Sequence, residues 1–160
     1  MNKADKVIPA PVPVYLVDAS IYIFRAWFGL PEQWHHSNGM PVHAVYGFCR
    51  WLLDFLADQR PGYVAANFDE SLGTCFRNSI YPAYKTSRAL PDENLAFQLQ
   101  LCQQLCRSLG VSVFASDAFE ADDLIASQAA SCQRQSIPVV VVSGDKDLAQ
   151  VLVHPHDRLW

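Results

Sequence analysis

The sequence predicts an α/β fold, in which a parallel sheet is flanked by helices. Short apolar runs alternate along the chain with longer segments of helical spacing, and strands that alternate with helices pair in parallel. The apolar runs lack a polar alternation, which is typical of strands buried on both faces. Of the 160 residues, 51% are hydrophobic and 18% are charged. This composition supports one domain with a core of its own.

The strands are expected after a proline-rich start. Residues 1–13 contain three prolines and predict an extended leader, because proline opposes helix and cannot donate to a central strand. The domain is expected to cover residues 14–160. Four buried strands are expected within it, at 14–18, 63–68, 111–115 and 139–143.

Helices are expected where apolar residues recur every three or four positions. These segments are 41–56, 95–109, 120–133 and the short 146–152. Gly110 follows the second of them and is the residue type that commonly ends a helix. Residues 70–91 form a long connection that is rich in basic and aromatic side chains, and connections of that length are usually functional or mobile.

Seven carboxylates follow the four expected strands. They are Asp18, Asp69, Glu120, Asp122, Asp123, Asp145 and Asp147. Ligands bind to open α/β sheets at the carboxyl ends of the strands, so these acids are expected at one edge. Two unit charges ~4 Å apart repel by roughly 4 kcal/mol at an effective dielectric near 20, so seven together require cations. Oxygen ligands alone favour Mg²⁺ or Mn²⁺, and two such ions held by carboxylates serve phosphodiester hydrolysis.

Helix capping is the alternative explanation for any single acid. Asp117 and Glu120 have the spacing of a capping box, and Asp92 and Asp145 stand where N-cap residues are expected. Capping at all four strand ends together is a much weaker explanation. The metal site is therefore the favoured interpretation.

The net charge of −4 does not exclude a nucleic-acid partner, although phosphate-binding surfaces are basic. Without the seven clustered acids, the rest of the chain carries +3. No apolar run is long enough to cross a membrane. The five cysteines are interpreted as reduced thiols of a cytoplasmic protein.

Six short motifs stand in order between about Val14 and Leu152. They are Val-Asp18, Ala44-Val-Tyr-Gly-Phe48, Phe68-Asp69, Tyr84-Lys85-x-x-Arg88, Glu120-Ala-Asp122-Asp123 and Gly144-Asp145-Lys-Asp147-Leu. Together they resemble the 5′-nuclease family of bacterial 5′–3′ exonucleases and flap endonucleases, which includes the domain at the front of bacterial DNA polymerase I.

The resemblance implies a PIN-like, three-layer fold and hydrolysis of DNA by a two-metal mechanism. The substrate would be DNA with a 5′ flap or a single-stranded 5′ end. One ion would activate a water molecule, and the other would stabilise the leaving 3′ oxygen. The resemblance divides the ligands into two sets: Asp18, Asp69, Glu120 and Asp122 for the first ion, then Asp145 and Asp147, with Asp123 nearby, for the second.

The connection 70–91 resembles the helical arch of that family, the gateway for a single-stranded 5′ end. The resemblance makes Lys85 and Arg88 the catalytic clamps on the scissile phosphate. Contacts with nucleic acid are expected from Arg25, Arg77, Tyr81, Tyr84, Lys85 and Arg88. The side chains from Arg77 to Arg88 have nearly the spacing of one helical face, although Pro82 opposes a continuous helix. The alternative is a solvated loop whose tyrosines pack on the core.

The family pattern continues past the Asp-Lys-Asp segment to a Gly-Asp-x-x-Asp-Asn motif and a helix–hairpin–helix element, and this sequence has neither. We therefore expect an incomplete second metal site and an exposed apolar face through which the chain forms homo-oligomers. Two other functions stay open. One is a catalytically incomplete nuclease core that binds nucleic acid or a protein, and the weaker one is a PIN-type ribonuclease. The latter needs fewer acids and no arch.

Overall fold

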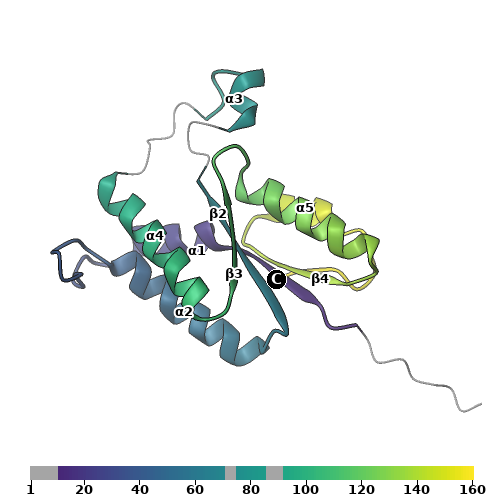
Figure 1. The fold of residues 1–160 in the computed structure, drawn as a ribbon, viewed down its shortest axis with the longest axis horizontal. Coiled ribbons are helices and arrows are strands. Elements are labelled where there is room, and N and C mark those ends of the chain that lie inside the picture. The colour runs from purple at the N-terminus through teal and green to yellow at the C-terminus, as the bar shows by residue number, and fades with distance from the viewer. Residues whose placement is uncertain (1–10, 71–74, 86–91) are drawn as a thin grey trace, which may run out of the picture.

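A central parallel sheet lies between two layers of helices in the computed structural model, which describes residues 11–70, 75–85 and 92–160 (Figure 1). All strand pairs are parallel, in the order β3-β2-β1-β4-β5. The strands are β1 (Val14–Asp18), β2 (Tyr63–Asp69), β3 (Ser112–Ser116), β4 (Val139–Val142) and β5 (Arg158–Leu159). The predicted α/β class with a parallel sheet is confirmed.

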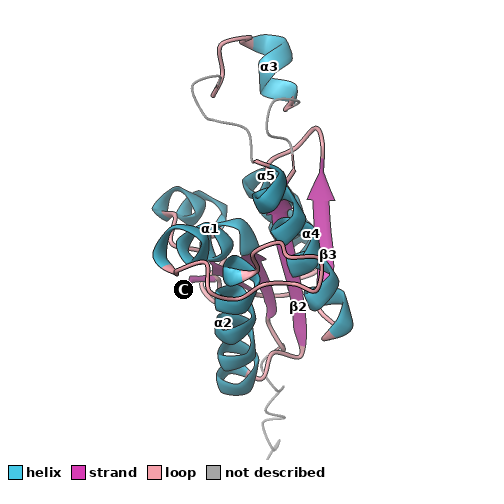
Figure 2. Ribbon diagram, turned by 90° about the vertical axis from the view of Figure 1, so that its left-hand side faces the viewer, coloured by secondary structure: helices cyan, strands magenta, loops and turns pink. Residues whose placement is uncertain are grey.

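The helices divide between the two faces of this sheet. One layer contains α1 (Ala19–Gly29), α2 (His43–Gln59) and α4 (Glu93–Ser108). The other contains α5 (Ala121–Arg134) and the 3₁₀ helix η1 (Lys146–Val151). The short helix α3 (Phe76–Ile80) lies beyond the carboxyl end of β3 (Figure 2). None of the helices described is both long and apolar enough to cross a membrane.

Each central strand contributes to two separate hydrophobic cores. Val17 faces α1, α2 and α4, whereas its neighbour Leu16 packs in the cluster with Ile125 of α5. The valines of β4 alternate in the same way between the two clusters. Successive side chains of a strand point to opposite faces, so a strand covered on both sides must be apolar throughout. This is the physical reason for the uninterrupted apolar runs in the sequence.

Two elements were absent from the sequence-based expectations. The helix α1 follows β1 directly, and its sequence contains consecutive apolar residues on all sides, which hides the helical period. The strand β5 has only two residues and carries no propensity signal. The predicted helix at 41–56 begins at His43 and extends to Gln59, and Gly110 follows α4 with φ +77°, as expected for a helix end. The leader expected at 1–13 lies, apart from residues 11–13, outside the described residues.

The contact between α1 and α2 depends on Gly47, which belongs to one of the six motifs. A Cβ at Gly47 would lie 2.5 Å from Ala26 Cβ and 2.7 Å from Leu30 Cδ1. A glycine therefore permits the close approach of the two helices. The contact lies toward the C-terminal end of α1, the helix that begins directly after Asp18.

We predict that Gly47→Ala destabilises the protein by about 1–3 kcal/mol, because the added methyl group must separate the two helices. The matched control is Gly29→Ala, whose Cβ would meet nothing within 4 Å. That change is expected to be neutral or slightly stabilising. Urea unfolding measures both free energies, and equal stability of the two variants would contradict the close contact.

Candidate functional site

The carboxyl ends of β1 and β2 place Asp18 and Asp69 at the same edge, next to Asp122 in the first turn of α5. Asp18 is only 7% exposed. Burial raises the pKa of Asp18 to about 6, and repulsion by Asp69 and Asp122 adds to this rise. The ionised form of Asp18 is therefore disfavoured unless a cation lies beside it.

Asp122 is the second acid with an unfavourable environment. Burial raises its pKa above the ordinary value, and repulsion by Asp69, Asp145 and Glu120 raises it further. The fold thus brings together Asp18, Asp69, Glu120, Asp122 and Asp145, which come from four segments of the chain. Their charges raise the pKa values of Asp18 and Asp122 at one edge of the sheet, and the role of these acids as metal ligands stays a prediction.

Backbone amides fix the position of Asp69. Its Oδ1 accepts a hydrogen bond of 2.6 Å from the Ala121 amide at the start of α5. The Asp69 amide in turn donates to Ser20 Oγ in α1, at 2.9 Å. One aspartate therefore connects the end of β2 to the first turns of two helices, and it profits from the positive end of the α5 dipole.

A serine that the sequence analysis did not single out connects Asp18 to Asp145. The Ser143 hydroxyl donates to Asp18 Oδ2 at 2.8 Å and accepts a hydrogen bond from the Asp145 amide at 3.1 Å. Asp145 Oδ1 then accepts from the Asp147 amide at 2.9 Å. The signal in the sequence is a serine directly after an apolar strand, where the chain turns toward the acids.

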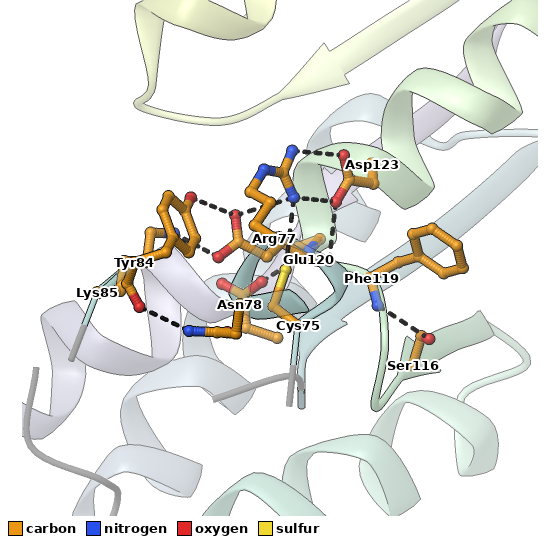
Figure 3. A network of polar contacts seen from close by, with 11 residues as sticks. Cys75, Arg77, Asn78, Tyr84, Lys85, Ser116, Phe119, Glu120 and Asp123 are labelled. Carbon is orange, nitrogen blue, oxygen red and sulfur yellow. Dashed lines mark hydrogen bonds and ion pairs between the residues drawn. The ribbon is translucent and has the colours of Figure 1, made fainter. Parts of the chain in front are cut away.

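Two cations of the connection after β2 contact Glu120 and Asp123, which we call the outer acids, as Figure 3 shows. Lys85 Nζ is 2.6 Å from Glu120 Oε1, and the Arg77 guanidinium donates two hydrogen bonds to Asp123, at 2.6 and 2.7 Å. Hydrogen bonds from Arg77 lower the pKa of Asp123 below its ordinary value. Burial lowers the pKa of Lys85, but the bonds with Glu120 and Tyr84 outweigh burial and raise it overall.

Packing also holds this segment against the start of α5. The Phe76 amide donates to the Ala118 carbonyl at 2.9 Å, and the Phe76 and Phe119 rings are 5.5 Å apart. The Asn78 side chain donates to the Tyr84 carbonyl at 2.8 Å, which folds the segment back on itself. The described residues 75–85 thus present their cations to the acids.

The described part of the segment from Arg77 to Arg88 does not form one helical face, in agreement with the break expected at Pro82. The helix α3 ends at Ile80, and Lys85 has φ +53°. Pro82 interrupts the helix, because proline removes a backbone donor and clashes with the preceding turn. Tyr84 and Lys85 reach Glu120 from a turn instead, with Tyr84 Oη donating to Glu120 Oε2 at 3.2 Å.

The remaining predicted contact residues lie apart from this ion-pair network. Arg25 is exposed on α1, with its guanidinium 5.5 Å from the Tyr22 ring centroid and beside Gly144. Tyr81 is 62% exposed. Arg88 lies outside the described residues, as do the parts of the predicted arch at 71–74 and 86–91.

Several acids near the sheet edge also cap helices, so capping and the metal-site interpretation do not exclude each other. Asp92 caps α4 by accepting from the Leu95 amide, and Asp145 caps η1. The capping box predicted for Asp117 and Glu120 is formed one turn later, by Glu120 and Asp123. Glu120 is itself the N-cap residue of α5, and Asp123 accepts from its amide at 3.1 Å. The capping bonds orient the acids toward the edge without neutralising them.

The donor set at this edge fits a hard divalent cation. Its side-chain donors are carboxylate oxygens, and among the described residues no basic group forms an ion pair with Asp18 or Asp122. No group of three or more His, Cys, Asp or Glu side chains in the described part of the chain forms a ready-made metal cluster. Asp18, Asp69 and Asp122 repel one another, while Lys85 and Arg77 form ion pairs with Glu120 and Asp123.

Comparison with known proteins identifies the family to which this architecture is related. Residues 13–160 match the family described as 5′–3′ exonuclease, N-terminal resolvase-like domain. DNA polymerase I of Rhizobium leguminosarum is 38% identical over 156 residues, which cover 91% of this chain and 15% of the relative. DNA polymerase I of Mycobacterium tuberculosis (strain ATCC 25618 / H37Rv) is 38% identical over 138 residues, which cover 86% of this chain and 15% of the relative.

Solved structures from bacteriophage T5 share the fold. The T5 D15 protein co-crystallised with metal ions has a TM-score of 0.70 at 17% identity, covering 91% of this chain and 54% of that one. A T5 5′-exonuclease with bound zinc has a TM-score of 0.64 at 18% identity, covering 88% and 52%. A T5 D15 flap endonuclease in a pseudo-enzyme–product complex with DNA and metal ions has a TM-score of 0.57 at 20% identity, covering 91% and 54%. The PIN-like, three-layer fold is thereby confirmed.

We predict that Arg77→Gln speeds tryptic cleavage after Lys85 about 5-fold, because loss of a partly exposed ion pair of about 1 kcal/mol releases the segment 75–85 more often. The control is Arg60→Gln. The Arg60 Nε contacts the Ala57 carbonyl at 3.4 Å, far from the acids, and Pro61 follows it. Mass spectrometry quantifies the cleavage, and an unchanged rate in Arg77→Gln would contradict the role of the ion pair.

Proposed function

Because the chain belongs to the 5′–3′ exonuclease N-terminal domain family, we propose that it hydrolyses DNA phosphodiester bonds at 5′ flaps or single-stranded 5′ ends with the help of Mg²⁺ or Mn²⁺. The observation that carries the proposal is the meeting of carboxylates from four segments at one sheet edge, with a cationic segment directly above them. The DNA and metal ions in the T5 flap endonuclease complex support the same substrate class.

We assign the acids to two metal ions, as the family resemblance implies. Asp18, Asp69, Glu120 and Asp122 would hold the first, and Asp145 and Asp147 would hold the second, with Asp123 nearby. When bound, the ions supply positive charge that activates water and stabilises the leaving 3′ oxygen. Asp18 and Asp122 are the primary candidates, because their burial and mutual repulsion make them the acids that gain most from a cation.

We propose that the Lys85 ammonium group leaves Glu120 and binds the scissile phosphate. Its ammonium group lies 2.6 Å from Glu120, at the border of the acidic edge. A short movement of this flexible side chain brings the charge to a phosphate oxygen, where it stabilises the charge that develops during hydrolysis. Tyr84 and Tyr81 would stack on bases of the single strand, and Arg25, Arg77 and Arg88 would contact its phosphates.

A catalytically incomplete nuclease core that binds nucleic acid without cutting it is the second candidate. The ion pairs of Lys85 with Glu120 and of Arg77 with Asp123 favour it, because they occupy two of the acids. The chain spans about 15% of the length of its DNA polymerase I relatives. A PIN-type ribonuclease is the third candidate, and the cationic segment 75–85 argues for a DNA flap instead. A cytoplasmic location and homo-oligomers stay predictions from the sequence.

The test is cleavage of a labelled 5′-flap DNA duplex, and of its RNA counterpart, with Mg²⁺ or Mn²⁺ and with a chelator. We expect chelator-sensitive cutting of DNA near the flap junction. Asp122→Asn is expected to reduce cutting to the level of the chelator control, because it removes one charge from the metal site. Lys85→Ala is expected to lower turnover about 100-fold while metal binding measured by calorimetry persists.

The matched control is Asp54→Asn, which changes an exposed acid of α2 in the same way. It should leave cutting unchanged. Full activity of Asp122→Asn would contradict the metal assignment. DNA binding without any cutting would favour the second candidate, and preferential cutting of RNA would favour the third.

A further inference from the structure

The Ser143 hydroxyl forms one hydrogen bond that stabilises the turn after β4 and a second one, to Asp18, that the turn does not require. A serine that accepts a hydrogen bond from the amide two residues later stabilises a turn, and Ser143 does this with the Asp145 amide at 3.1 Å. That bond uses a lone pair of the oxygen. The single proton of the hydroxyl is given to Asp18 Oδ2 at 2.8 Å, across 125 positions of sequence.

The two bonds of Ser143 connect acids that come from different strands. Asp18 ends the central strand β1, and Asp145 follows its neighbour β4. Asp145 in turn accepts from the Asp147 amide. One hydroxyl therefore lies between the acids that the proposed function assigns to the first ion and those that it assigns to the second.

Ser143 is also held firmly enough to position its partners. It is only 5% exposed, and its own amide donates to the Trp160 carbonyl at 3.1 Å. The Ser143 hydroxyl and the Ile21 amide both donate to the Asp18 carboxylate, and two donors from different elements restrict its orientation. Groups that orient metal ligands in this way commonly change metal affinity 10–100-fold when they are removed.

We infer that Ser143 is a positioning residue that orients the Asp18 carboxylate toward the metal and couples it to the Asp145 segment. This inference rests on the proposed metal-dependent function. Removal of the hydroxyl leaves the Asp18 carboxylate with the hydrogen bond from the Ile21 amide but without the bond that ties it to the β4 side of the edge, and it loosens the turn that carries Asp145. The conservative replacement by threonine keeps the hydroxyl and both of its hydrogen bonds.

The test compares the melting temperature in chelator with that in Mn²⁺ or Mg²⁺ for the unmodified chain, Ser143→Ala, Ser143→Thr and the control Ser108→Ala. Ser108 is an exposed serine whose hydroxyl bonds to the Gln104 carbonyl at the far end of α4. A metal that binds the native state raises the melting temperature according to its affinity. A purely structural loss lowers the melting temperature equally with and without metal.

We expect Ser143→Ala to weaken Mn²⁺ binding about 10- to 100-fold and to shrink the metal-induced rise. Ser143→Thr and Ser108→Ala should keep the Mn²⁺ affinity and the metal-induced rise in melting temperature of the unmodified chain. Calorimetry gives the affinities directly. If the unmodified chain binds metal and Ser143→Ala binds it within about 2-fold, the positioning role is overturned and the proposed function stands. If the unmodified chain binds no metal, both are overturned.

Discussion

Electrostatic repulsion among carboxylates at the carboxyl end of the sheet is the constraint on which the rest of the site depends. Asp18 is buried and Asp122 is half-buried beside Asp69, and both have pKa values above the ordinary range. A fold that only maximised stability would place other residues there, because each charge removed from water costs free energy. The three-layer core keeps the acids in place: apolar contacts on both faces of β1 and β4 fix the strand ends.

The contacts of the outer acids, Glu120 and Asp123, differ from those of Asp18 and Asp69. Arg77 and Lys85 neutralise Asp123 and Glu120 from the segment 75–85, at the entrance to the edge. Asp18 accepts a hydrogen bond from the Ser143 hydroxyl, and Asp69 accepts one from the Ala121 amide. A neutral donor orients a carboxylate without cancelling its charge. The same arrangement places mobile side-chain cations where a phosphate would approach.

Much of this architecture follows from the sequence, because parallel strands and their termini have strong local signals. The apolar runs ending at Asp18 and Asp69 locate the strands, and the rule that ligands bind at strand carboxyl ends locates the site. Helix α1 was missed because its apolar residues show no period. The network at Glu120 was not foreseen either, since Pro82 and the turn at Lys85 replace the expected helical face. Ser143 is marked in the sequence only by its place directly after an apolar strand, and its contact with Asp18 across the sheet is one that no spacing along the chain reveals.

The most direct measurement of the central claim is X-ray diffraction from crystals grown with Mn²⁺, using its anomalous signal to locate the ion. We expect an anomalous peak among Asp18, Asp69 and Asp122, with Ser143 still bonded to Asp18. Peaks only at other places in the crystal, with the carboxylates unchanged, would contradict the claim that this edge of the sheet exists to hold a metal ion.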